Sequence, residues 1–158
     1  MKANIGITEE HNTATGLILN TLLADEQVLY VKTKNYHWNV TRASFNDFHL
    51  FFDKQAEEIE EIIDETAERI RSLGHFAVGT MKDFLNLSRL LEHSSDERNG
   101  GLQLIKNLLE DHEIIIKTLR NDIPVVGEKY KDLGSNDFLT GILVKHEKMA
   151  WMLRSYLQ

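Results

Sequence analysis

Cysteine is absent from the 158 residues of this chain, and proline occurs only once, as Pro124. Without cysteine the chain has no disulfide bonds and no thiolate-ligated metal site. The single proline, together with glycines concentrated in the connections, favours an all-helical chain. No apolar run approaches the roughly 18 residues of a membrane span, and the first residues lack the apolar stretch of a signal peptide. We therefore expect a cytoplasmic protein that does not enter a membrane.

The chain also has little positive charge: 18 Lys and Arg stand against 25 Asp and Glu, for a formal net charge of -7. The first sixteen residues hold Lys2 against Glu9 and Glu10, and the chain stops at Leu157 and Gln158 without a basic tail. Direct binding to phosphates needs clustered Lys or Arg side chains. The charge distribution therefore argues against a nucleic-acid partner.

Length and periodicity predict one helical domain over residues 1–158, with residues 1–7 as a flexible N-terminus. A hydrophobic content of 42% over this length suits one ordinary core. The predicted helices are a first ending near Trp38, a second from Phe45 to Leu73, a short one within Met81 to Leu87, a third long helix from Leu104 to Ile123, and a last from about Asn136 to Tyr156. Capping boxes are expected at Ser44 with Asp47 and at Ser94 with Glu97. Pro124 is expected to stop the third long helix.

Two pairs of candidate ligands lie on the second predicted helix. His49 and Asp53 are four residues apart, as are Asp64 and Glu68. The two side chains of each pair therefore lie on the same face of the helix, one turn apart, and could bind one cation. At 1.5 Å per residue, however, His49 and Glu68 lie roughly 28 Å apart along the axis. No single ion can contact both ends of one helix.

A two-fold axis near the midpoint of this helix resolves the conflict. The two pairs are centred on the same point of the sequence, so His49 of one chain would face Glu68 of a second copy, and Asp53 would face its Asp64. Such a dimer generates two equivalent sites with ligands from both chains. The seven acids between Glu57 and Glu68 would also suit a solvated helix face. His49 and the mirrored spacing favour the metal site.

His37 lies twelve residues before His49, at the end of the first predicted helix, and can reach the same site from the side. The resulting set of two imidazoles and three carboxylates suits Fe(II), Mn(II) or Zn(II) better than copper or an iron–sulfur cluster. Iron is the leading candidate, although ligand type alone does not select it.

These residues also carry a family resemblance. His37 to Val40, Phe45, His49, Phe52 with Asp53, and Asp64 to Arg69 resemble the signature of the Dps proteins, ferritin-like shells named as DNA-binding proteins of starved cells. The similarity extends over nearly the whole chain and includes Leu22 to Glu26, Asp111 to Glu113 and His146 to Arg154. One departure is Arg42, where family members usually have glycine.

The resemblance implies a four-helix bundle with a short extra helix between the second and third helices, assembled into a shell of twelve subunits. It assigns His37, His49 and Asp53 to the ferroxidase centre from one subunit, and Asp64 and Glu68 from its two-fold mate. It also places Trp38 beside the centre, where it traps oxidising equivalents. An aspartate matching Asp137 lines acidic pores in the family, and we add Asp132 and Glu128 as further pore candidates that would steer Fe(II) inward.

The resulting hypothesis is a ferroxidase that oxidises Fe(II), preferably with hydrogen peroxide, and stores ferric oxide. The main alternative is a DNA-binding nucleoid protein of the same family, which the charge disfavours. A conventional ferritin is disfavoured because the chain has no Glu-x-x-His motif, and a structural zinc bundle is the third rival. His112 and His146 also neighbour glutamates, but we expect structural roles for them, such as hydrogen bonds.

Overall fold

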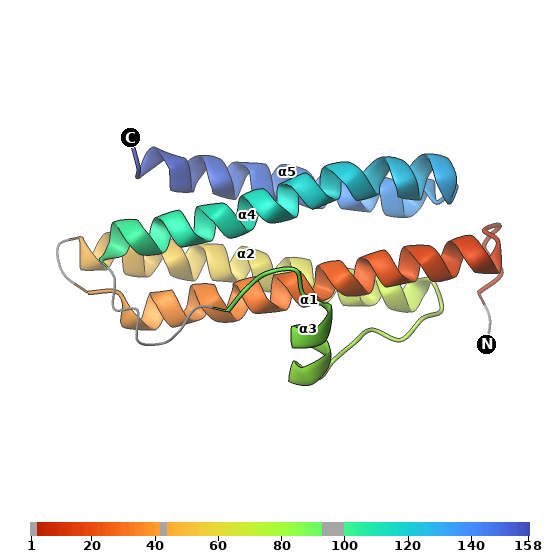
Figure 1. Ribbon diagram of the computed structural model, residues 1–158, viewed down its shortest axis with the longest axis horizontal. Coiled ribbons are helices and arrows are strands. Elements are labelled where there is room, and N and C mark those ends of the chain that lie inside the picture. Colours follow the sequence, from red (N-terminus) through yellow and green to blue (C-terminus); the bar gives the residue numbers. More distant parts are fainter. Residues whose placement is uncertain (1–2, 42–43, 93–99) are drawn as a thin grey trace.

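The computed structural model describes residues 3–41, 44–92 and 100–158 of the chain. Its elements are α1 (Glu9–Asn39), α2 (Phe45–Ser72), α3 (Met81–Leu87), α4 (Gly101–Pro124), a π-helical turn η1 (Val125–Lys129) and α5 (Leu133–Ser155). The four long helices form a bundle, and short α3 lies outside it on the connection between α2 and α4 (Figure 1). The described residues contain no β-strand. The predicted all-α, ferritin-like four-helix bundle with its extra helix is confirmed.

The bundle consists of two antiparallel hairpins, α1 with α2 and α4 with α5, which lie on each other (Figure 1). Its core is built from fully buried aliphatic and aromatic side chains, among them Leu29, Phe52, Ile59, Ile105 and Ile115. Burying one such side chain contributes about 1.5–3 kcal/mol. None of the described helices contains the extended apolar stretch that a membrane-spanning segment requires.

Helix α2 separates its apolar residues from its acids. Ile59, Ile62 and Ile70 are fully buried in the core, whereas Asp64 and Glu68 are exposed. The helix ends at Ser72, one residue before the predicted boundary. Gly74 follows with a φ of 90°, a left-handed conformation that glycine adopts without steric cost. The end of α2 is therefore encoded locally.

The capping box predicted at Ser44 is wrong. Ser44 does precede α2, but its φ is 62° and its side chain makes no capping hydrogen bond. A capping serine is normally extended, so that its oxygen points back at the free amides of the first turn, and left-handed Ser44 lacks this geometry. Ser94 and Glu97, the second predicted box, lie outside the described residues, as does Arg42.

The third long helix, α4, ends at Pro124 as predicted, but the helical path of the chain does not break there. Proline is the last residue of α4, and the chain continues directly into η1. The wider π-helical turn ends with a hydrogen bond from the Tyr130 amide to the Val125 carbonyl, 3.0 Å long. The chain then turns at Lys131, whose φ is 59°. The missing amide of proline is thus accommodated by a change of helix type rather than by a break.

The last helix begins at Leu133, three residues earlier than predicted. The buried side chain of Asp132 caps it by accepting hydrogen bonds from the amide of Ser135 at 2.9 Å and from its hydroxyl at 2.6 Å. With this cap, Gly134 and Ser135 are drawn into the first turn of α5 instead of preceding it.

Candidate metal centre

His37 and His49 are brought together where α1 ends and α2 begins. The Nδ1 atom of His37 lies 2.8 Å from the carbonyl oxygen of His49, and the Nδ1 atom of His49 lies 2.9 Å from the carbonyl oxygen of His37. A carbonyl oxygen only accepts, so each Nδ1 carries the proton and donates. The rings stack with centroids 3.9 Å apart. In the neutral rings both Nε2 atoms are therefore unprotonated, which is the form that binds a metal.

Asp53 lies one turn further along α2 and belongs to the same group. Its Oδ1 atom is 3.7 Å from Nε2 of His37 and 2.8 Å from Nζ of Lys34 on α1. The hydrogen bond from Lys34 lowers the pKa of the Asp53 carboxyl below its usual value. The same hydrogen bond raises the pKa of Lys34. The pair is therefore an ionised carboxylate and an ammonium.

Asp64 and Glu68 lie apart from this group, on the exposed surface of the same helix. From the helical rise, Asp53 and Asp64 are about 17 Å apart along the axis. Glu68 borders a shallow surface pocket with Glu65, Arg69, Ser72 and Phe138. Over residues 3–41, 44–92 and 100–158 of a single chain, no three His, Asp or Glu side chains are arranged to hold a metal ion. The five predicted ligands thus fall into two separate groups.

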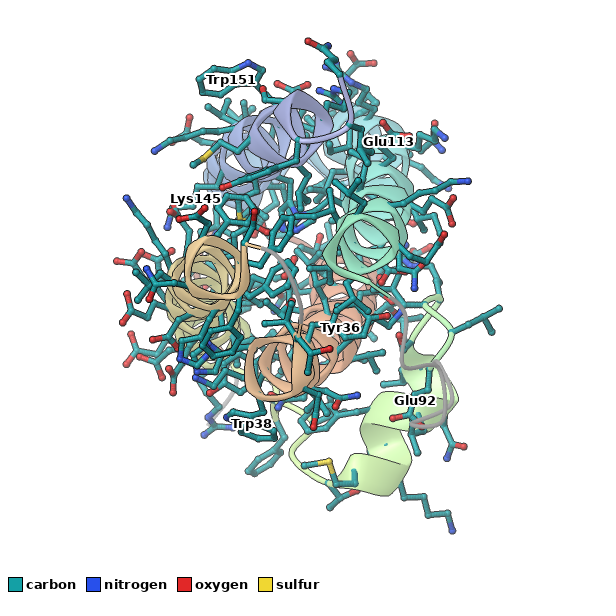
Figure 2. All side chains as sticks on the ribbon, turned by 90° about the vertical axis from the view of Figure 1, so that its left-hand side faces the viewer. Tyr36, Trp38, Glu92, Glu113, Lys145 and Trp151 are labelled. Carbon is teal, nitrogen blue, oxygen red and sulfur yellow. The ribbon has the colours of Figure 1, made fainter. Side chains whose placement is uncertain are left out.

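Trp38 and two neighbouring apolar side chains are exposed around the first group. Trp38 is 66% exposed and points away from the bundle (Figure 2). Phe45 is 46% exposed and stacks on His49 with ring centroids 5.1 Å apart, and Leu50 is 58% exposed. Exposed large apolar side chains next to a site are compatible with a surface that contacts another protein.

The three predicted pore residues differ in their surroundings. Asp132 is only 2% exposed, and besides capping α5 it forms an ion pair with Arg69 at 3.2 Å. Its carboxylate therefore holds α5 against α2. These contacts argue against a role for Asp132 in a pore. Asp137 in the second turn of α5 and Glu128 in η1 are both exposed.

A buried polar cluster in the bundle core joins α1, α4 and α5. The Nδ1 atoms of His112 and His146 are 2.9 Å apart, and Nε2 of His146 lies 2.8 Å from Oε1 of Glu26. All three residues are fully buried. Burial, reinforced by the charge of His146, lowers the pKa of His112 well below its usual value. The expected hydrogen-bonding roles of both histidines agree with this arrangement.

Sequence reasoning missed Lys34 and Glu26. Lys34 lies three residues before His37, so helical spacing already places the two on one face of α1. Glu26 follows the apolar run at Leu22 and Leu23, and a carboxylate on a core face signals a buried partner. Both signals were present in the sequence, but neither identifies the partner.

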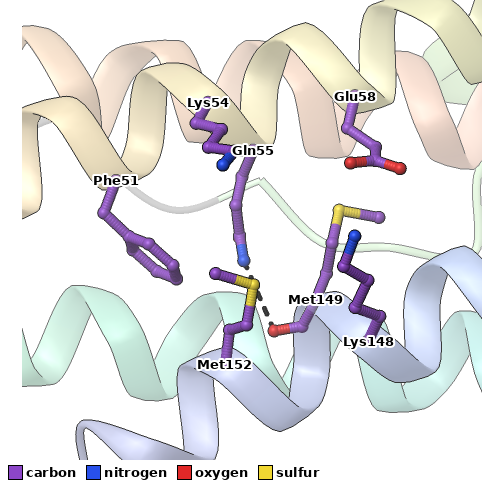
Figure 3. A pocket seen from close by; sticks show the side chains of 7 residues that line it. All are labelled: Phe51, Lys54, Gln55, Glu58, Lys148, Met149 and Met152. Carbon is purple, nitrogen blue, oxygen red and sulfur yellow. Dashed lines mark hydrogen bonds between the residues drawn. The ribbon is translucent and has the colours of Figure 1, made fainter.

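A pocket between α2 and α5 contains none of the predicted ligands (Figure 3). It is lined by Phe51, Lys54, Gln55, Glu58, Lys148, Met149 and Met152. The Gln55 amide donates a 3.3 Å hydrogen bond to the carbonyl of Met149 (Figure 3). The pocket is therefore separate from the metal-ligand group at the turn between α1 and α2.

Comparison with known proteins places the chain in a family. A family model described as a ferritin-like domain matches residues 17–158. A low temperature-induced protein of Nostoc sp. (strain PCC 7120) is 41% identical over 99% of this chain and 87% of its own length. The DNA protection during starvation protein 2 of Bacillus anthracis is 34% identical over 89% of this chain and 94% of its own length.

A solved structure agrees with these relatives. The Dps protein of Vibrio cholerae O1, described as a member of a broad superfamily of ferritin-like diiron-carboxylate proteins, superposes with a TM-score of 0.92 at 27% identity. The match covers 99% of this chain and 97% of that one. With the bundle, the paired histidines and these matches together, the chain belongs to the Dps family of ferritin-like proteins.

Proposed function

We propose that this protein is a ferroxidase and iron-storage protein that oxidises Fe(II) at sites shared by two subunits and stores the product as ferric oxide in a hollow shell. Membership of the ferritin-like Dps family supports iron oxidation and storage as the general class of function. Hydrogen peroxide as preferred oxidant, a shell of twelve subunits and a cytoplasmic location are further parts of the proposal.

The reciprocal hydrogen bonds between His37 and His49 are the observation that carries the proposal. They hold both imidazoles as metal-binding tautomers before any ion arrives, and Asp53 supplies a carboxylate beside them. Neutral imidazole and carboxylate together suit Fe(II), and carboxylate oxygens stabilise the harder Fe(III) product. Two imidazoles and a carboxylate leave coordination positions for further ligands.

Asp64 and Glu68 of a second subunit would supply those ligands. Both are exposed, and the side chain of neither forms a hydrogen bond or an ion pair with another residue in the described part of the chain. The exposed side chains of Trp38, Phe45 and Leu50 support burial of this surface against a second copy. Antiparallel contact of two α2 helices would then complete two equivalent sites.

The proposed reaction consumes two Fe(II), one hydrogen peroxide and two protons, and yields two Fe(III) and two water molecules. Iron is the substrate, and the ligands place two ions where peroxide can take one electron from each. Trp38, next to His37 in sequence, would trap stray oxidising equivalents. Asp137 and Glu128, both exposed, would line the entry route for Fe(II).

Mixed oligomers provide a direct test of shared sites. One chain carries His37→Ala with His49→Ala, and the other carries Asp64→Ala with Glu68→Ala. Each variant alone should oxidise Fe(II) at least tenfold more slowly than wild type. In a dimer of the two variants, one site combines both defects while the other has only wild-type ligands, so co-assembled protein should recover a substantial fraction of the activity.

In the matched control, the second chain carries Glu57→Ala with Glu61→Ala instead. These are two exposed acids that are also four residues apart on α2. An oligomer of this double variant alone should oxidise Fe(II) at the initial rate of the wild-type protein. Stopped-flow absorbance of Fe(III) after anaerobic Fe(II) loading and peroxide addition measures each rate. Failure of the mixed oligomer to exceed its two parents would overturn the shared site.

A DNA-binding role is the alternative candidate. The Bacillus anthracis relative is named for DNA protection during starvation. Against this role, the chain has a formal net charge of -7. A net negative charge repels the phosphate backbone, so the iron-oxidising function is favoured.

A further inference from the structure

Lys34 lies where a cation bound to Asp53 would lie. Its Nζ atom is 2.8 Å from Oδ1 of Asp53, and the same oxygen is 3.7 Å from Nε2 of His37. The side chain of Lys34 is 23% exposed and that of Asp53 is 39% exposed, so the pair is only partly shielded from solvent. Lys34 comes from α1, one turn before His37.

The separation of the two proposed ligand atoms suits a single metal ion. Ions such as Zn²⁺ bind imidazole nitrogen and carboxylate oxygen at about 2.0–2.2 Å, which places two donors on one ion about 3–4 Å apart. An ion between Nε2 of His37 and Oδ1 of Asp53 would share that oxygen with the ammonium of Lys34. Two positive charges on one carboxylate oxygen repel each other strongly at this range.

We infer that Lys34 acts as a built-in competitor for the metal: its ammonium neutralises Asp53 in the metal-free site and has to leave before an ion binds. The affinity of the site for divalent cations is thereby held below what its ligands alone would give. This inference rests on the proposed function, because it takes His37 and Asp53 to be ligands.

An ordinary inter-helical salt bridge is the competing interpretation of the same contact. On that interpretation the pair adds a little to stability, as partly exposed ion pairs do, and no metal ion binds Asp53 where Lys34 lies. Removing the charge of Lys34 would then leave metal affinity unchanged. The two interpretations therefore differ in metal binding rather than in folding.

The experiment measures Co²⁺ binding, because Co²⁺ is not oxidised under these conditions and its visible absorption reports nitrogen and oxygen ligation. The variant Lys34→Met keeps the length of the side chain and removes its charge. Lys117→Met, on the exposed face of α4, is the control with the same change in net charge. We expect Lys34→Met to bind Co²⁺ at least tenfold more tightly than wild type, and Lys117→Met to stay within twofold. Equal or weaker binding by Lys34→Met would overturn the inference.

Two further measurements keep the test decisive if Lys34→Met folds poorly. Lys34→Arg retains the charge, and its Co²⁺ affinity should not rise. In crystals of the wild-type protein soaked with Co²⁺, Nζ of Lys34 should have moved beyond ion-pair distance of Asp53. An intact Lys34 to Asp53 contact beside bound Co²⁺ would refute the competition.

His49→Asn separates this inference from the proposed function. If this variant binds Co²⁺ with the wild-type spectrum and affinity, then the proposed site itself is wrong. If His49→Asn abolishes the spectrum while Lys34→Met binds no more tightly than wild type, then only the role of Lys34 fails.

Discussion

The imidazole rings of His37 and His49 stack with centroids 3.9 Å apart, and each ring donates a hydrogen bond to the backbone carbonyl of the other residue. This exchange ties the last turn of α1 to the first turns of α2. The two Nδ1 protons are used in holding the hairpin together, and the two Nε2 atoms are left for a ligand. The geometry of the proposed metal site is therefore set by the packing of the hairpin.

His49→Asn should separate these two functions of the ring. The asparagine amide nitrogen takes the place of Nδ1 and can still donate to the carbonyl of His37, but nothing replaces Nε2. We expect the rate of Fe(II) oxidation to fall at least tenfold. Because the hydrogen bond is retained, the loss of stability should stay at or below about 1 kcal/mol, the usual net value of such a bond. Stopped-flow oxidation and denaturant unfolding measure the two effects, and a wild-type oxidation rate would remove Nε2 of His49 from the site.

The buried cluster of His112, His146 and Glu26 should make the protein sensitive to acid. Because the pKa of His112 is depressed in the folded state, the unfolded chain binds a proton that the folded chain does not, from about pH 6.5 downward. Stability is therefore fully present above about pH 6.5 and falls by up to about 1.4 kcal/mol per pH unit below it, until the folded-state pKa is reached.

Denaturant unfolding at pH 7.5 and pH 5.5 measures this dependence. His112→Gln cannot titrate and should lose less stability between the two pH values than wild type. The control His11→Gln, at a partly exposed histidine beside Tyr130, should keep the wild-type dependence. The assignment to His112 fails if both variants lose as much stability as wild type.

Two glycine-to-alanine substitutions should have opposite effects. A Cβ atom on Gly101 would overlap the ring of Phe48, which also contacts the rings of Phe52 and Tyr156. Gly101→Ala should cost about 1–3 kcal/mol, as overpacking does. A Cβ atom on Gly141 in α5 meets nothing within 4 Å, so Gly141→Ala should stabilise the protein by about 0.5–1 kcal/mol. Thermal unfolding midpoints that move in the same direction would contradict the packing described for Phe48.

The protein should not retard DNA in a gel at neutral pH without divalent ions. The net charge of -7 leaves no electrostatic gain on meeting a phosphate backbone. The measurement is a mobility shift at low salt, where any electrostatic binding is strongest, with a basic DNA-binding protein as positive control. Firm retardation under these conditions would favour the nucleoid-protein alternative.

Helix positions and ligand spacing were accessible from the sequence alone. The predicted second helix differs from α2 by one residue, because an apolar stripe, an acidic face and a terminal Gly74 are all local features. The spacing of His49, Asp53, Asp64 and Glu68 likewise follows from helical periodicity. The errors arose at helix ends: the conformation of Ser44, the π-helical turn after Pro124 and the capping of α5 by Asp132 depend on where the chain turns next.

What only the tertiary structure decided is which side chains meet. The sequence determined that His37, Lys34 and Asp53 lie on particular faces of two helices, but their meeting depends on the register of the α1 and α2 hairpin. The same holds for Glu26, His112 and His146, which come from three helices. Periodicity sets the face of a residue within its own helix, whereas hydrogen bonds and ion pairs act over about 3 Å and require the packing of the whole bundle to fix their partners.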